Sequence, residues 1–156
     1  MRLLLLMSAL TLLFATPATA HDITKGTIQI IHPTISLSPK GAKTAAGYMA
    51  VSNDGNASDR LIGVETPIAK AAKIHTSEMK DGVVRMTHVL SLEVPADDTV
   101  VLEPGGLHLM FMGLTTVLAD DQMYPATLIF EKAGPITIEF MIDDTRDDHG
   151  NHSVNE

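Results

Sequence analysis

Histidine and methionine alternate with apolar residues in the segment His108-Leu109-Met110-Phe111-Met112. In a β-strand, side chains at alternate positions leave opposite faces, so positions 108, 110 and 112 would share one face. That face would carry an imidazole and two thioethers, directly after a turn predicted at Pro104-Gly105-Gly106. We interpret the segment as part of a candidate metal site. The alternative is that these methionines fill gaps in the core, as methionine often does.

A second group of such side chains surrounds the dipeptide Asp81-Gly82. Asp-Gly between two apolar or alternating segments is a strong signal for a β-hairpin with a two-residue turn. His75 and Met79 would share a face of the strand before the turn. Met86 and His88 would share a face of the strand after it. Both strands of the expected hairpin therefore offer a histidine and a methionine.

The combination of imidazole and thioether side chains favours copper. Thioethers select Cu(I), whereas imidazole suits copper in both oxidation states. Sites for Ca²⁺ or Mg²⁺ would be rich in carboxylates, and structural zinc usually takes thiolates. The chain has nine methionines and no cysteine. This composition excludes disulfides, Cys-ligated zinc, blue-copper electron-transfer centres and a lipid-modified cysteine.

Length and charge restrict the class of protein. The chain has 156 residues, 45% of them hydrophobic, so we expect a single domain with a packed core. Eleven basic and 19 acidic residues give a formal net charge of −8, which argues against a nucleic-acid-binding surface. Residues 143–156 are rich in aspartate and have no apolar stripe. We expect them to form a flexible acidic tail.

Residues 1–20 have the pattern of a secretory signal peptide. Arg2 precedes an apolar run from Leu3 to Ala15, and Ala18-Thr19-Ala20 is a small-residue cleavage site before His21. The apolar run is too short to cross a bilayer, which takes about 20 residues. We therefore expect cleavage and export to the periplasm, with a mature chain that begins at His21 and has no membrane anchor.

Short segments rich in β-branched and apolar residues are separated by Gly, Pro, Asn and Asp along residues 21–142. Their spacing predicts an all-β domain, a sandwich or barrel of about eight or nine strands. Two segments, Ile68–Lys73 and Thr115–Asp121, could each form one turn of helix, and neither is long enough for an α/β fold. The expected strands are 27–31, ending at His32-Pro33, and then 45–52, 60–64, 73–79, 83–90, 100–102, 108–114, 124–131 and 136–142.

The spacing of four residues resembles the copper-binding signature of the periplasmic copper chaperone family called PCu(A)C. His75, ten residues, Met86, twenty-one residues and then His108-Leu109-Met110 reproduce the pattern H-x10-M-x21-H-x-M. The surrounding sequence is also similar to the family, from about Thr27 to Met141. One departure is Thr76, which occupies a position where relatives often have a second methionine or an acidic residue.

This resemblance implies an all-β fold, a cupredoxin-like Greek-key barrel, that binds one Cu(I) through His75, Met86, His108 and Met110. It implies a copper chaperone and not an enzyme, with the copper ion as its cargo. The recipient would be an apo subunit of cytochrome c oxidase, at its CuA centre, or another copper-assembly protein. We also expect a monomer. Its ligand side chains should be partly exposed and should contribute little to the stability of the copper-free protein.

Three residues near the predicted site lie outside the signature. Met112 is expected to pack beside the site, and His88 could be an alternative ligand because it shares a face with Met86. Met79 lies near the site on the first strand of the hairpin, without an assigned role. Each of these side chains has the simpler interpretation of packing or surface exposure.

The remaining histidines could bind Cu(II) at a secondary site. His21 would combine its imidazole with the free α-amine that cleavage creates, and His149 and His152 lie among aspartates in the tail. Imidazole suits Cu(II), but none of these residues has a located partner in the sequence. His32, before a proline, is expected to be a surface residue.

Two other functions would use the same chemistry. A periplasmic protein for copper sequestration and tolerance would have the same ligands as a carrier. A secreted copper enzyme could use His21, but it would also need an open coordination position and a substrate cleft, which the sequence does not reveal. The loss of a carrier should lower oxidase activity when copper is scarce, whereas the loss of a sequestering protein should raise copper sensitivity.

Overall fold

The computed structural model describes residues 22–36, 39, 41–120 and 122–143. The predicted signal peptide, His21, His149 and His152 lie outside the described residues. In the described part the chain is all-β, as expected, and no helix there is long and apolar enough to cross a membrane. The strands are β1 (Ile23–Lys25), β2 (Ile28–Ser36), β3 (Thr44–Asn53), β4 (Asp59–Glu65), β5 (Ala69–Lys80), β6 (Val83–Val89), β7 (Leu92–Val94), β8 (Asp98–Leu102), β9 (Leu107–Leu114), β10 (Tyr124–Phe130) and β11 (Gly134–Asp143).

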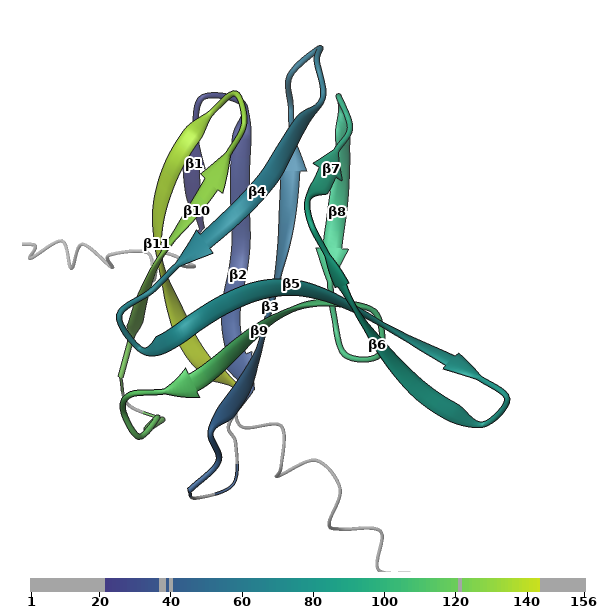
Figure 1. Ribbon diagram of the computed structural model, residues 1–156. Helices are drawn as coiled ribbons and strands as arrows, with labels where there is room; N and C mark the ends of the chain where they lie inside the picture. The colour runs from purple at the N-terminus through teal and green to yellow at the C-terminus, as the bar shows by residue number, and fades with distance from the viewer. Residues whose placement is uncertain (1–21, 37–38, 40, 121, 144–156) are drawn as a thin grey trace, which may run out of the picture.

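Seven of these strands close into a barrel. They follow the order β2-β11-β10-β4-β5-β9-β3, and β3 pairs again with β2 (Figure 1). The β2–β11 pair is parallel, whereas the other neighbours in the ring are antiparallel. The four remaining strands, β1, β6, β7 and β8, are each paired with one strand of the ring. Closure leaves few free strand edges, which is how all-β domains avoid edge-to-edge association.

Alternation along the strands forms the core of the barrel. On β10, for example, Tyr124, Ala126, Leu128 and Phe130 are buried, whereas the residues between them are more exposed. This period of two places one set of side chains inside the barrel and the other toward solvent. The largest fully buried side chains are Phe111, Phe130, Phe140, Ile28, Ile30, Ile35, Leu61, Leu102, Leu109, Leu128, Ile138 and Val51.

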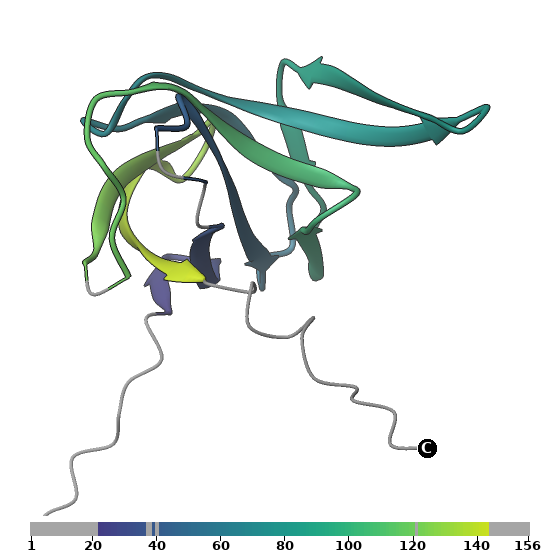
Figure 2. The ribbon, with the colours of Figure 1, turned by 90° about the horizontal axis from the view of Figure 1, so that it is seen from below.

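The β5–β6 hairpin extends to the side of the barrel (Figures 1 and 2). The first part of β5 pairs with β9, and its last residues pair only with β6. The turn between β5 and β6 is formed by Asp81 and Gly82, with φ angles of 54° and 76°. Positive φ at both central residues is typical of the type I′ turn that Asp-Gly favours. The hairpin predicted from this dipeptide is therefore confirmed.

Other local predictions were wrong. β2 does not end at His32-Pro33 but continues to Ser36, with a register shift between Ile31 and Thr34 and a φ of 51° at His32. A bulge can contain a proline, because the extra residues leave the ladder of hydrogen bonds. Residues 69–73 belong to β5, and no helical turn is present in the described part of 115–121. The short strands β1 and β7 were not predicted.

A buried carboxylate connects β4 with the turn between β10 and β11. Asp59 accepts hydrogen bonds from the backbone N–H groups of Arg60 at 2.7 Å, Lys132 at 2.9 Å and Ala133 at 2.8 Å. Burial favours a higher pKa, but these donors and the Lys132 charge outweigh it and lower the pKa of Asp59 below its usual value. The sequence offered no sign of this structural role.

Candidate metal centre

Strands β6, β5 and β9 lie side by side and bring three histidines into one row. His75 on β5 is directly opposite His88 on β6 and directly opposite His108 on β9. The ring centroids of His75 and His88 are 5.5 Å apart, and those of His75 and His108 are 5.9 Å apart. The rings of His75 and His108 are stacked, with 21° between their planes. The hairpin and β9 thus meet at His75.

The two predicted thioether ligands lie on the same face as His75. Met86 is opposite Ser77, and Met110 is opposite Lys73. Ser77 and Lys73 are each two positions from His75, so all of these side chains share a face of the sheet. Diagonal neighbours in a sheet are about 7–8 Å apart, within reach of long side chains. The structure brings the four predicted site residues to one face, and their role as ligands stays a prediction.

The imidazole of His108 is held in one tautomer. Its Nδ1 donates to the carbonyl oxygen of Gly106 at 3.0 Å, and the same oxygen accepts from the N–H of Ser77 at 3.0 Å. Because a carbonyl only accepts, Nδ1 carries the proton and Nε2 has its lone pair free, as in many metal-binding histidines. The expectation of a partly exposed ligand was wrong for His108, which is only 5% exposed. The neighbouring strand β5 lies beside it, and its ring is hydrogen-bonded to Gly106 in the turn before β9.

The ring of His75 has an unsatisfied nitrogen. Its Nδ1 is buried and has no hydrogen-bond partner. Burial lowers the pKa of His75, and repulsion from His108 and His88 acts in the same direction, against an opposing contribution from the backbone of Lys73. That backbone does not make a hydrogen bond of normal geometry with Nδ1. A neutral imidazole with an unpaired buried nitrogen is suited to receive a metal ion.

The set of donors fits a soft ion. No three His, Asp or Glu side chains in the described residues are grouped so that they could hold a metal ion by themselves. The donors next to His75 are imidazoles and thioethers, all of them neutral. Cu(I) accepts such donors, whereas Ca²⁺ and Mg²⁺ require oxygen ligands. Met86 is 54% exposed, so the candidate centre opens onto the surface at the hairpin.

Other predicted residues lie at different distances from the centre. Met112 is on the same face but opposite Ala71 and Thr44, further from His75 than Met110. His88, the predicted alternative ligand, is directly beside His75. His32 is exposed on β2, where its backbone N–H donates to Asp22 Oδ1 at 3.2 Å.

Two neighbours of the centre were not predicted. Lys73 is exposed and opposite Met110 on the site face, so a cation lies beside the candidate ligands. Tyr48 follows Gly47, which is opposite Leu109, so the same register places it level with His108. Burial raises the pKa of Tyr48. Only the pairing of β3 and β5 with β9 reveals either neighbour, because neither carries a metal-ligand signal in the sequence.

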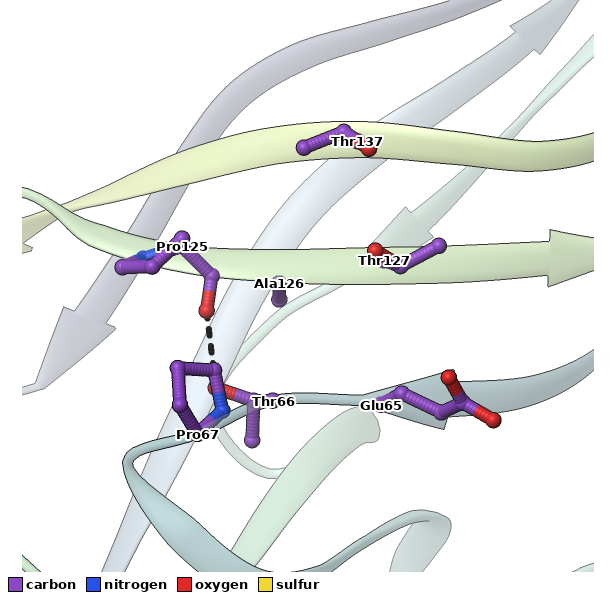
Figure 3. Close-up of a pocket in the computed structure, with 7 residues that line it drawn as sticks. All are labelled: Glu65, Thr66, Pro67, Pro125, Ala126, Thr127 and Thr137. Atoms are coloured by element: carbon purple, nitrogen blue, oxygen red, sulfur yellow. Dashed lines mark hydrogen bonds between the residues drawn. The ribbon is translucent and has the colours of Figure 1, made fainter.

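A groove on another part of the barrel is unrelated to this centre (Figure 3). It has a volume of about 410 Å³, and Thr66 Oγ1 donates to the Pro125 carbonyl oxygen across it at 2.8 Å. Its lining contains no histidine or methionine, so it offers no soft ligand for copper. The lining residues are Glu65, Thr66, Pro67, Pro125, Ala126, Thr127 and Thr137.

Sequence comparison finds one matching family and a bacterial relative. The family described as "Putative lipoprotein LpqE-like" matches residues 28–142. The protein named "Putative lipoprotein Lxx21020" from Leifsonia xyli subsp. xyli is 32% identical over 91 residues. The match covers 58% of this chain and 55% of the relative, so the chain spans little more than half of that relative's length.

Comparison with solved structures finds PCuAC domains. The "Copper-bound PCuAC domain from PmoF2" has a TM-score of 0.70 and 27% identity, over 80% of this chain and 98% of that domain. The "apo PmoF2 PCuAC domain" has a TM-score of 0.68 and 28% identity, over 80% and 95%. Apo-DR1885 from Deinococcus radiodurans shares the fold, with a TM-score of 0.61 and 22% identity over 93% and 97%. The barrel therefore has the cupredoxin-like fold that the resemblance implied.

Proposed function

We propose that this chain, which belongs to the LpqE-like family, is a carrier of Cu(I) that binds one ion through His75, Met86, His108 and Met110. The observation that carries the proposal is the row of imidazoles across β6, β5 and β9 with a thioether on each diagonal of His75. The buried and unpaired Nδ1 of His75 supports it. So does the similarity to a domain whose structure is described as copper-bound.

Neutral ligands give such a carrier its properties. Two imidazoles and two thioethers leave bound Cu(I) with a single positive charge, and thioethers favour Cu(I) over Cu(II). The hydrogen bond to Gly106 holds His108 with Nε2 free, so one ligand is oriented before the metal arrives. Met86 lies on the hairpin and is 54% exposed, so an acceptor can reach the ion on this side. A site with one buried ligand and one exposed ligand can both hold and release its ion.

The resemblance to PCu(A)C proteins supports a proposal for the destination of the copper. We infer that the protein is a periplasmic chaperone, not an enzyme, that supplies an apo subunit of cytochrome c oxidase or another copper-assembly protein. The matching family and the relative from Leifsonia xyli are each described with the words "Putative lipoprotein". The 156 residues of this chain contain no cysteine to which a lipid could be attached. The inference of export therefore rests on the pattern of residues 1–20.

The decisive experiment is a Cu(I) titration against a competing chromophoric chelator, with X-ray absorption on the loaded protein. We expect one Cu(I) per chain, with both sulfur and nitrogen in its shell. Met110→Leu should remove one sulfur neighbour, whereas Met112→Leu, a matched change further along the same strand, should leave the shell unaltered. A shell of only oxygen and nitrogen, or a protein that releases Cu(I) to a weak chelator, would contradict the proposal.

A further inference from the structure

The β5–β6 hairpin has two chemically different faces beyond the barrel. On one face Glu78 is opposite Arg85, and Lys80 is opposite Val83. The other face continues the face of His75 and has no charged residue between the metal centre and the turn. Its members are Ser77, Met79, Val84, Met86 and His88. The hairpin thus presents a charged side and a side with soft donors.

Two thioethers are exposed on the uncharged face. Met79 is 75% exposed, and Met86 is 54% exposed. Val84, opposite Met79, is also exposed. These methionines do not fill a gap in the core, which is the usual structural role of methionine. Both thioethers are therefore accessible to a ligand on the face that carries the candidate metal centre.

Met86 has candidate ligands on two sides. Its direct partner across the hairpin is Ser77, so His75 and Met79 are its two diagonal neighbours. His88 lies two positions further along β6 on the same face, with its ring centroid 5.5 Å from that of His75. Met86 therefore lies between His75 and His88 on the barrel side and Met79 on the side of the turn, and it can share an ion with either side.

We propose that Met79, Met86 and His88 form an outer Cu(I) site on the hairpin, next to the inner set of His75, His108 and Met110. This inference rests on the proposed function, and Met86 belongs to both sets. The ion passes between them by exchange of one neutral ligand at a time. A Cu–S or Cu–N bond forms as another breaks, copper stays in the Cu(I) state, and no proton is transferred.

Partial burial of the inner set is the physical reason for an outer site. His108 is buried, and His75 and Met110 are half-buried, so a ligand from another molecule has less access to an ion held by these residues than to an ion on the hairpin. Met79, Met86 and His88 are exposed, and their donors are of the same soft, neutral type. An ion on the hairpin is therefore accessible to an acceptor while it still has protein ligands.

The test separates the rate of copper release from the affinity. The purified protein is loaded with one equivalent of Cu(I) and mixed with excess bathocuproine disulfonate, and the coloured chelate is followed by stopped flow. Affinity is measured separately with limiting chelator.

Met79→Leu and His88→Gln should each slow release by about tenfold, the lower end of the range for residues that support a metal site. Their affinity should change by less than about threefold, because the inner set is intact. Met112→Leu is the matched control and should change neither quantity.

Each outcome decides between the inner and the outer site. Release by both variants at the wild-type rate overturns the outer site while the proposed carrier function stands. A fall in affinity as large as that of Met110→Leu also overturns it, because Met79 or His88 would then belong to the inner set. A wild-type protein that never retains Cu(I) against the chelator refutes the proposed function, and the outer site with it.

A direct observation uses Ag(I), a redox-stable substitute for Cu(I), and protein labelled at the methionine methyl groups. In the NMR spectrum the first equivalent of Ag(I) should shift the signals of Met86 and Met110. The signal of Met79 should shift or broaden with the same equivalent, because the ion exchanges between the two sets, and His88→Gln should reduce this change. A Met79 signal that does not respond to excess Ag(I) overturns the proposal.

Discussion

Asp59 and His75 each have a buried polar group, but only the group of Asp59 has hydrogen-bond partners of normal geometry. The Asp59 carboxylate accepts three backbone hydrogen bonds where β4 meets the turn between β10 and β11. Nδ1 of His75 is buried and makes no hydrogen bond of normal geometry. Native proteins satisfy nearly all of their buried polar groups, so the exception points to function. One group stabilises the barrel, and the other is left free for a ligand.

The comparison also predicts how each position responds to substitution. Removal of an acceptor leaves its donors unsatisfied in a buried place, which costs stability. Removal of a group that had no partner relieves a cost that is already present. Substitution of Asp59 should therefore affect folding but not copper, and substitution of His75 should affect copper but not folding.

The largest effect on stability is expected for Asp59→Ala. The variant leaves the N–H groups of Arg60, Lys132 and Ala133 without their acceptor, at roughly 1 kcal/mol for each, so about 3 kcal/mol in all. Urea unfolding at pH 7 measures the loss. Asp98→Ala is the control, because exposed Asp98 accepts only the N–H of Thr99 and should cost less than about 0.5 kcal/mol. Equal losses of unfolding free energy in the two variants would show that the three hydrogen bonds to Asp59 stabilise the protein no more than the single bond to Asp98.

The pH dependence of stability tests whether the charge of the Asp59 carboxylate stabilises the protein. The pKa of Asp59 is lower in the folded protein than the usual value of 3.8, so the unfolded chain binds this proton more readily. The stabilising contribution of Asp59 is fully present above the unfolded pKa and is lost as pH falls through the lower folded pKa. We therefore expect the wild type to have a higher free energy of unfolding than Asp59→Asn at pH 6. In urea unfolding between pH 6 and pH 2, this difference should disappear below about pH 4. A constant difference across this range would mean that the carboxylate charge is not involved.

A smaller loss is expected for His108→Ala in the copper-free protein. The sequence alone favoured almost no loss, but the buried ring and its hydrogen bond to Gly106 now predict about 1–2 kcal/mol. Thermal unfolding without copper measures this loss. Cu(I) should stabilise the wild type and not the variant, because a ligand stabilises the state that binds it. Equal stabilisation of both proteins by Cu(I) would place the metal elsewhere, with His21 or the His149 and His152 tail as the first candidates.

Local patterns in the sequence predicted much of the site. Alternation along 108–112 correctly placed His108, Met110 and Met112 on one face, and Asp81-Gly82 correctly placed the hairpin turn. These features depend on neighbours in the chain, where period and turn chemistry are decisive. The spacing of the four predicted ligands drew attention to residues that the fold then brought to one face.

Features that depend on distant pairing could not be predicted in the same way. The register of His75 opposite His108 follows from closure of the barrel, and the single-sequence pattern does not specify it. The alanine-rich start of β5 has helical propensity, but pairing with β9 overrides that propensity. The burial of His108 and the partners of Asp59 arise from segments far apart in the chain.

The smallest effect on stability is expected at His75, where the contrast with Asp59 is most direct. His75→Leu replaces the imidazole with an apolar side chain of similar size and removes a buried nitrogen that has no hydrogen bond. The copper-free variant should unfold within about 0.5 kcal/mol of the wild type, or be slightly more stable, because no hydrogen bond of normal geometry to Nδ1 is lost. Its affinity for Cu(I) should nevertheless fall by about a hundredfold, since the central ligand of the row is gone. Urea unfolding and chelator competition on the same preparation measure both quantities. A large loss of stability with affinity unchanged would reverse the assignment and make His75 a structural residue like Asp59.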